Sequence, residues 1–272
     1  FVPILMSSDI PQQLFNKFQD LINKPVSDQT EFFLKSFIFA LDTEWKKLIE
    51  LSKTFNKYLA DYGQADGDTA CALDPSQAAD FLQKNGKTRT AMQRRTEIRD
   101  IDIDNNDRIT FIEYLLLHFK SMIITEYYKR TGDVNPYDLS QDGIGVTGVG
   151  AILLDELFTL PLGLDPALEA AIEEFTATKK AREAQLKTLQ ERASKGGVRG
   201  MAAKNEIEQL ETQDSTDMNR LELTLNAAKK KAAKKSGEEA VRERKNAEEA
   251  AAKAKAEESR AKLKARAALW NQ

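Results

Sequence analysis

The chain has 272 residues, of which 41% are hydrophobic, 31% charged and 8% aromatic. This apolar fraction is too high for a wholly disordered chain, and the length suits about one or two globular domains. Cys71 is the only cysteine and His118 the only histidine. These counts exclude an internal disulfide framework, fit a reducing compartment, and argue against an all-protein zinc site or a Cys–His nucleophile pair. No apolar run reaches the roughly 18 residues of a membrane span.

The charges are distributed unevenly along the chain. Residues 1–165 carry 17 Lys and Arg against 25 Asp and Glu, a net charge of −8, whereas residues 166–272 carry 23 against 18, a net charge of +5. Aromatic residues are concentrated in the first part, and Ala, Lys and Glu predominate in the second. We therefore expect an acidic helical domain at 1–165, a basic helical hairpin at 166–235 and a charged tail at 236–272.

Apolar residues recur at helical spacing throughout the first part of the chain, and almost no strand signal is present. The spacing predicts a first helix that ends before Pro25 and a long second helix from about Thr30 to Tyr62. Shorter helices are expected over about 75–84, 88–101, 113–130 and 151–160. The predicted fold class is therefore all-α.

The second part of the chain begins with a helix start at Asp165 and Pro166. A heptad-like apolar seam follows, halts at the glycine-rich segment 196–200 and resumes over 207–225. Two such helices joined by a glycine-rich turn predict a long antiparallel hairpin with coiled-coil character. From Gly237 onward the chain is Ala-rich with Glu–Lys pairs four residues apart, which predicts a charged C-terminal helix; disorder is the alternative.

Residues 102–113 fit the twelve-residue calcium loop of an EF-hand. Calcium is a hard cation that takes six to eight oxygen ligands, and the winding of such a loop turns alternate positions inward. The expected ligands are the side chains of Asp102, Asp104 and Asn106, the carbonyl of Arg108, Thr110 directly or through water, and both carboxylate oxygens of Glu113. The alternative is an acidic turn between helices that binds no metal.

The sixth and eighth positions of this loop lead to two further predictions. Asp107 occupies the sixth position, which is normally Gly with positive φ, so we expect calcium binding to be weakened by roughly 1 kcal/mol. Ile109 occupies the eighth position, where a paired loop would meet it in a short two-stranded contact. Segment 61–74 has the location of that partner but lacks its ligands, and is expected to be a degenerate, metal-free hand or a plain loop. Segment 138–149 lacks a closing Glu and is expected to be a turn.

A dense group of cations follows the second hairpin helix: Lys229, Lys230, Lys231, Lys234 and Lys235. Residues 229–266 hold 14 Lys and Arg against 7 Glu, so this tract would attract acidic polymers such as actin filaments, tubulin tails, nucleic acid or anionic lipid. A solvated helix face is the alternative. Nucleic acid is disfavoured because no stacking aromatic is interleaved, and membrane because the tract has no bulky apolar face.

Three stretches resemble the small calcium-regulated actin-bundling proteins. They are the loop with its flanks at 94–116, the turn Gly197-Val-Arg-Gly200, and residues 219–228 with the lysines after them. The resemblance covers roughly residues 30–235. It implies a cytoplasmic, cytoskeletal protein that cross-links actin filaments, is turned down by calcium, and binds filaments mainly through its C-terminal hairpin.

On this resemblance the expected filament contacts are Arg199 and Lys204 together with the lysines at 229–235. The competing function is a calcium-binding structural subunit of another cytoskeletal assembly, such as a microtubule-based one, which the long charged tail favours. An enzyme is the third possibility, and it is disfavoured because the sequence offers no nucleophile–base pair. His118, among apolar neighbours on the expected exit helix, is interpreted as a packed side chain.

Overall fold

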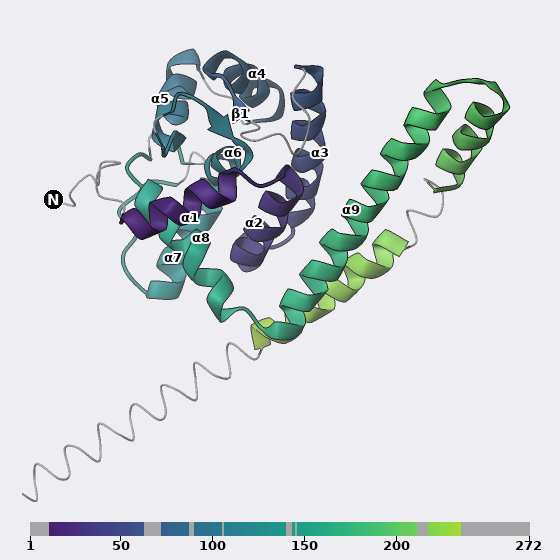
Figure 1. Cartoon of the computed structure of the whole chain (residues 1–272). Coiled ribbons are helices and arrows are strands. Elements are labelled where there is room, and N and C mark those ends of the chain that lie inside the picture. Colours follow the sequence, from purple (N-terminus) through teal and green to yellow (C-terminus); the bar gives the residue numbers. More distant parts are fainter. Residues whose placement is uncertain are drawn as a thin grey trace, which may run out of the picture.

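Helices account for the regular structure of the described residues, apart from one pair of two-residue strands, so the predicted all-α class is confirmed. The computed structural model describes residues 11–62, 72–86, 90–104, 106–139, 143–144, 146–210 and 217–234. Figure 1 shows a helical body from which a long hairpin projects. None of the helices in the described part combines the length and apolar character needed to cross a membrane.

The helices of the body surround α2, which contacts α3, α6, α7, α8 and the hairpin helix α9. The elements of the body are α1 (Gln12–Ile22), α2 (Val26–Leu41), α3 (Trp45–Asp61), β1 (Ala72–Leu73), α4 (Pro75–Asn85), α5 (Ala91–Ile101), β2 (Ile109–Thr110), α6 (Phe111–His118), α7 (Lys120–Thr131), α8 (Gly150–Thr159) and the 3-10 turn η2 (Leu160–Gly163). Their apolar faces form one continuous core.

The long helix predicted from about Thr30 to Tyr62 is wrong, because the chain breaks between α2 and α3. Asp42 has φ +45 and ends α2, a backbone conformation that Asp adopts more readily than most residues. The break directs Trp45 into the core, where it is 1% exposed. The exit helix predicted to reach about Arg130 is likewise divided at Phe119 into α6 and α7.

An aromatic cluster joins α3, α4 and α6. The ring of Phe55 lies 5.2 Å from that of Phe81 and 4.8 Å from that of Phe111, and Phe81 meets Tyr114 edge-on at 4.9 Å. His118 is buried beside this cluster, and its Nδ1 lies 3.2 Å from the Tyr114 hydroxyl. These contacts hold the two helix–loop–helix units of the body against each other.

The hairpin consists of α9 (Pro166–Ser194) and two returning helices over 197–210 and 217–234. Asp165 caps α9 by accepting the N–H groups of Ala167 and Leu168. The chain reverses where Gly196 and Gly197 have φ near +70, a region that favours glycine.

Contacts between the arms fix the hairpin. The Arg182 guanidinium donates to the Leu210 carbonyl at 3.0 Å. Figure 1 shows helix 217–234 running beside the first half of α9.

Aromatic packing and ion pairs dock the base of the hairpin on the body. Phe175 of α9 meets Trp45 edge-on, with ring centroids 5.4 Å apart. Lys35 of α2 lies 2.6 Å from the Glu173 carboxylate, and Lys46 pairs with Glu222 of the returning helix. The acidic and basic parts of the chain therefore meet in a specific interface.

Several expectations fall outside the described residues. These are the centre of segment 61–74, residues 140–142 and 145 of the segment predicted to be a turn, Lys235, and the tail at 236–272.

Candidate functional site

The loop at 102–113 brings three carboxylates together between α5 and α6. One oxygen from each of Asp102, Asp104 and Glu113 lies within 4.8 Å of the others. Asp102 follows the last residue of α5, and Glu113 is in the first turn of α6, so the two helices fix the ends of the loop. Three carboxylates at this separation repel one another when all are ionised, and such a donor set is typical of a site for a hard cation.

Glu113 is completely buried at the closing position of the loop. Its Oε1 accepts the N–H of Ile103 at 3.1 Å, and its Oε2 accepts both the N–H and the hydroxyl of Thr110 at 2.8 Å. Burial raises the pKa of the Glu113 carboxyl to about 8 because desolvation outweighs these three hydrogen bonds. Burial also raises the pKa of Asp102.

The first half of the loop is wound around the Asp102 carboxylate. Its two oxygens accept the N–H groups of Asn106 and Asp107, each at 3.0 Å. Asp107 has φ +55, so the chain makes at this position the sharp turn for which Gly is the usual residue. The substitution of Asp for Gly has therefore not abolished the loop conformation.

Three expected ligands take part in hydrogen bonds within the loop. Asn106 donates from Nδ2 to Asp104 at 2.8 Å, and its Oδ1 accepts the Arg108 N–H at 2.7 Å. The Thr110 hydroxyl is directed to Glu113 rather than to the other carboxylates. The structure thus brings the three carboxylates together, while Asn106, Arg108 and Thr110 make hydrogen bonds within the same loop.

Asp104 has two different environments for its oxygens. Oδ2 accepts a hydrogen bond from Gln19 Nε2 of α1 at 2.9 Å. Oδ1 is buried and has no hydrogen-bond partner among the described residues. A buried carboxylate oxygen without a donor is costly, and a cation at this point would satisfy it. The residues present therefore fit a calcium ion.

Gln19 was not anticipated, because it lies 85 residues from Asp104 and no local pattern connects them.

A short antiparallel pairing links the loop to the segment upstream. Ile109 pairs with Leu73, so the predicted two-stranded contact at the eighth loop position is confirmed. Downstream of this pair, Asp74 and Gln77 form a capping box at α4 that corresponds to the one at the start of α6. Gln77 therefore stands in the place of Glu113, and its neutral amide cannot supply a bidentate carboxylate.

The predicted basic residues lie at two separate places on the hairpin. Lys229, Lys230, Lys231 and Lys234, here named the base cluster, lie near the end of helix 217–234. Arg199 and Lys204 lie in helix 197–210, at the opposite end of the hairpin (Figure 1). The cations that the sequence predicted as filament contacts therefore form two separate surfaces in the structure.

The base cluster is partly engaged by the body. Lys229 Nζ donates to the Asp42 carboxylate at 2.9 Å and to the Asp42 carbonyl at 2.8 Å. This hydrogen bond holds the pKa of the Asp42 carboxyl below its usual value. Lys230, Lys231 and Lys234 are exposed.

Comparison with known proteins gives a match that covers the whole hairpin and part of the body. A family model described as F actin bundling C terminal matches residues 111–266. A solved structure, that of the 34 kDa F-actin bundling protein from Dictyostelium discoideum, is 21% identical with a TM-score of 0.41, over 84% of this chain and 91% of that chain. No curated protein sequence matches the chain.

Proposed function

The chain belongs to the F actin bundling family, and from this premise we propose that it binds actin filaments and cross-links them in the cytoskeleton. The observation that carries the proposal is the family match over residues 111–266, which includes every described residue of the hairpin. This is a family of bundling proteins rather than of enzymes, and we propose no catalytic role.

The hairpin offers the charge that filament binding needs. Lys230, Lys231 and Lys234 are exposed on helix 217–234 and have the sign to approach an acidic polymer. The contact would weaken as salt concentration rises, because exposed charges are screened within about 10 Å at 0.1 M salt.

Calcium is proposed as the ligand of the loop at 102–113. The residues that would hold it are Asp102, Asp104, Asn106, Arg108, Thr110 and Glu113. The support comes from the converging carboxylates and from the buried, unpaired oxygen of Asp104. A bound calcium ion would supply the positive charge that compensates the mutual repulsion of these carboxylates.

Helix α2 connects the loop to the base cluster. Near one end, the buried Gln29 side chain accepts the N–H of Ile112, the residue next to Glu113, at 3.0 Å. At the other end, Asp42 holds Lys229. A displacement of α6 would therefore be transmitted along α2 to Asp42, the residue that contacts the base cluster. This path supports regulation of bundling by calcium.

Co-sedimentation with filamentous actin tests the proposal. High-speed pelleting measures binding to single filaments, and low-speed pelleting measures bundles. We expect both without calcium and fewer bundles with calcium, whereas Glu113→Gln should bundle equally in both conditions. Absence of the protein from actin pellets in both conditions would refute the filament proposal, and equal bundling of the native protein with and without calcium would refute the regulation.

The charged tail supports a second candidate function, that of a calcium-binding structural subunit of a microtubule-based assembly. Residues 229–266 carry twice as many Lys and Arg as Glu, which also suits acidic tubulin tails. Pelleting with microtubules but not with actin would decide for this function.

A further inference from the structure

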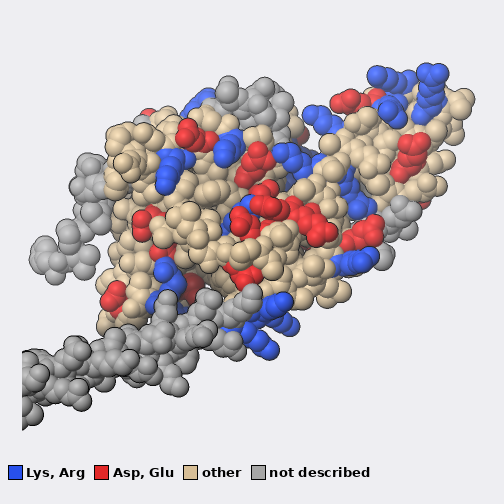
Figure 2. All heavy atoms as spheres, turned by 60° about the horizontal axis from the view of Figure 1, so that its bottom comes forward, with Lys and Arg blue, Asp and Glu red and all other residues tan. Residues whose placement is uncertain are grey.

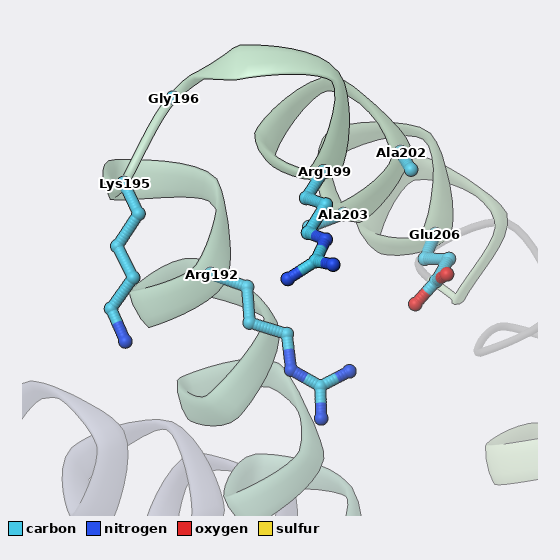
Figure 3. Close-up of a pocket in the computed structure, with 7 residues that line it drawn as sticks. All are labelled: Arg192, Lys195, Gly196, Arg199, Ala202, Ala203 and Glu206. Atoms are coloured by element: carbon cyan, nitrogen blue, oxygen red, sulfur yellow. The ribbon is translucent and has the colours of Figure 1, made fainter.

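The carboxylates of the loop at 102–113 are held in a different way from the charges at the end of the hairpin. Figure 2 shows Lys and Arg gathered at the projecting end, and in Figure 3 the side chains of Arg192 and Arg199 extend toward an open groove. Both of these side chains are exposed. The loop, in contrast, is contacted by glutamine side chains from α1 and α2, which are not the helices that flank it. Distant parts of the chain therefore contribute to the structure of the loop.

Gln19 of α1 contacts the loop at its third position. Its Nε2 donates to Oδ2 of Asp104 at 2.9 Å, and Asn106 donates to the same oxygen at 2.8 Å. Oδ1 of Asp104 is buried and has no hydrogen-bond partner among the described residues. Two donors therefore hold one oxygen of this carboxylate and leave the other available to an ion. The third position of a calcium loop supplies a side-chain oxygen, so this orientation is the one that the site requires.

Packing against the core fixes the position of Gln19. Phe18, Leu21 and Ile22 are buried and lie on one face of α1, because residues three and four apart are neighbours on a helix. Their burial sets the rotation of α1 about its axis. Gln19 lies beside this face and is half-buried. Its amide is therefore presented to Asp104 by a helix that the core already holds in place.

A second glutamine connects α1 to the other side of the loop. Gln29 of α2 is completely buried. Its Nε2 donates to the carbonyls of Ile22 at 3.2 Å and Lys24 at 2.8 Å, at the end of α1. Its Oε1 accepts the N–H of Ile112 in α6 at 3.0 Å. Helix α1 is therefore connected to the exit helix of the loop as well as to its third position.

We propose that Gln19 is a positioning residue of the calcium site, which orients Asp104 so that Oδ1 faces the ion, and that α1 is thereby part of the site. The inference rests on the calcium site of the proposed function. A hydrogen bond from a neighbouring side chain orients a metal ligand, and its loss typically weakens metal binding by about 10- to 100-fold. Gln19 is neutral, so its contribution comes from orientation of the carboxylate rather than from added charge.

Calcium should in turn stabilise α1. If the presence of α1 against the loop favours calcium binding, then calcium binding must favour the docked position of α1 by the same factor. Hydrogen exchange of the backbone amides of α1 (Gln12–Ile22) should therefore slow when calcium binds. This effect depends on the contact between Gln19 and Asp104 and should be lost with it.

The test is Gln19→Leu in the full chain, which removes the donor and keeps a side chain of similar size. Asn106 still donates to Oδ2 of Asp104, so helical content and thermal midpoint without calcium should match those of the native protein. The matched control is Gln13→Leu, which replaces an exposed glutamine of the same helix. Calcium affinity is measured by calorimetry at one pH, and hydrogen exchange of α1 is measured with and without calcium.

We expect Gln19→Leu to bind calcium at least about tenfold more weakly than the native protein, while Gln13→Leu binds normally. Calcium should slow hydrogen exchange of α1 in the native protein and in the control but not in Gln19→Leu. These results together would support a role in positioning Asp104.

A calcium affinity of Gln19→Leu within about twofold of the native value would overturn the inference and leave the proposed calcium site intact. Equal weakening by Gln13→Leu, or a loss of calcium-free stability in Gln19→Leu, would also overturn it, because the effect would then come from the packing of α1. Absence of calcium binding by the native protein would reject the inference and the proposed calcium site together.

Discussion

The protonation of Glu113 should make calcium binding depend strongly on pH. Burial raises the pKa of this carboxyl to about 8 in the calcium-free protein. Because calcium requires the carboxylate, binding must displace a proton at lower pH. With this pKa the group is half ionised at pH 8 and about one-hundredth ionised at pH 6, so affinity should rise roughly 50-fold between these values.

Titration calorimetry with calcium at pH 6, 7 and 8 measures this effect. Repeating each titration in two buffers with different ionisation enthalpies counts the protons released, and we expect close to one per calcium at pH 6 and about half of one at pH 8. His118 is the only histidine of the chain, so His118→Gln serves as the control for proton release by a histidine. The pH dependence should persist in that variant.

A change in affinity of less than about threefold from pH 6 to pH 8, with no proton released, would refute the reasoning. It would mean that the Glu113 carboxylate is already ionised in the calcium-free protein. The three hydrogen bonds it accepts would then outweigh its burial.

The same raised pKa has a consequence for stability. The folded, calcium-free protein keeps the proton on Glu113 up to a pH of about 8, whereas the unfolded chain releases it near the ordinary value of 4.5. The folded state binds more protons between these values, so this group lowers stability progressively as pH rises from 4.5 to 8. Urea unfolding with and without calcium should show the loss only in the calcium-free protein.

Three further changes test separate parts of the structure. Asp107→Gly relieves a positive φ of 55° that the loop already has without calcium, and should raise the free energy of unfolding by roughly 1 kcal/mol in urea. Phe175→Ala removes a ring that is 1% exposed against Trp45, and should lower the free energy of unfolding by about 3–5 kcal/mol in urea. Lys179→Met removes a buried cation that lies 3.5 Å from Glu183 Oε1, a buried oxygen with no hydrogen-bond partner among the described residues, and should lower the free energy of unfolding by about 1 kcal/mol in urea.

The convergence of carboxylates in the loop at 102–113 could be predicted from the sequence because its geometry is local. The carboxylates of Asp102, Asp104 and Glu113 belong to one twelve-residue segment, and the spacing alone brings them together. The reversal at Gly196 and Gly197 is local for the same reason, since positive φ in two successive residues favours glycine.

The division of α2 from α3 could not be predicted from apolar spacing. The apolar residues on both sides of Asp42 continue at intervals that fit one uninterrupted helix, so periodicity does not show the break. The break depends on a tertiary contact, because Trp45 packs against Phe175 of a helix that lies more than a hundred residues later in the chain. Gln19 and Gln29 escaped notice for a similar reason, since each bonds a residue more than 80 positions away.

Because the chain folds into a hairpin, the separation of two charged residues in the sequence does not show how far apart they lie in space. Arg199 and Lys229 are 30 positions apart and lie toward opposite ends of the hairpin, whereas Lys229 and Asp42 are 187 positions apart and in contact (Figure 1). A local charge sum combines the first pair into one surface and cannot reveal the second contact. Only the base cluster is close enough to the body to respond to the loop at 102–113.

This placement yields a last prediction. If the loop acts on filament binding through α2 and Asp42, the contact between Asp42 and Lys229 should carry the effect of calcium. Asp42→Asn removes the negative charge that holds Lys229, so this variant should bundle filaments with less dependence on calcium than the native protein in low-speed sedimentation. Its calcium affinity in calorimetry should stay unchanged, because Asp42 lies outside the loop at 102–113. Bundling by Asp42→Asn that responds to calcium as strongly as bundling by the native protein would show that regulation does not pass through the base cluster.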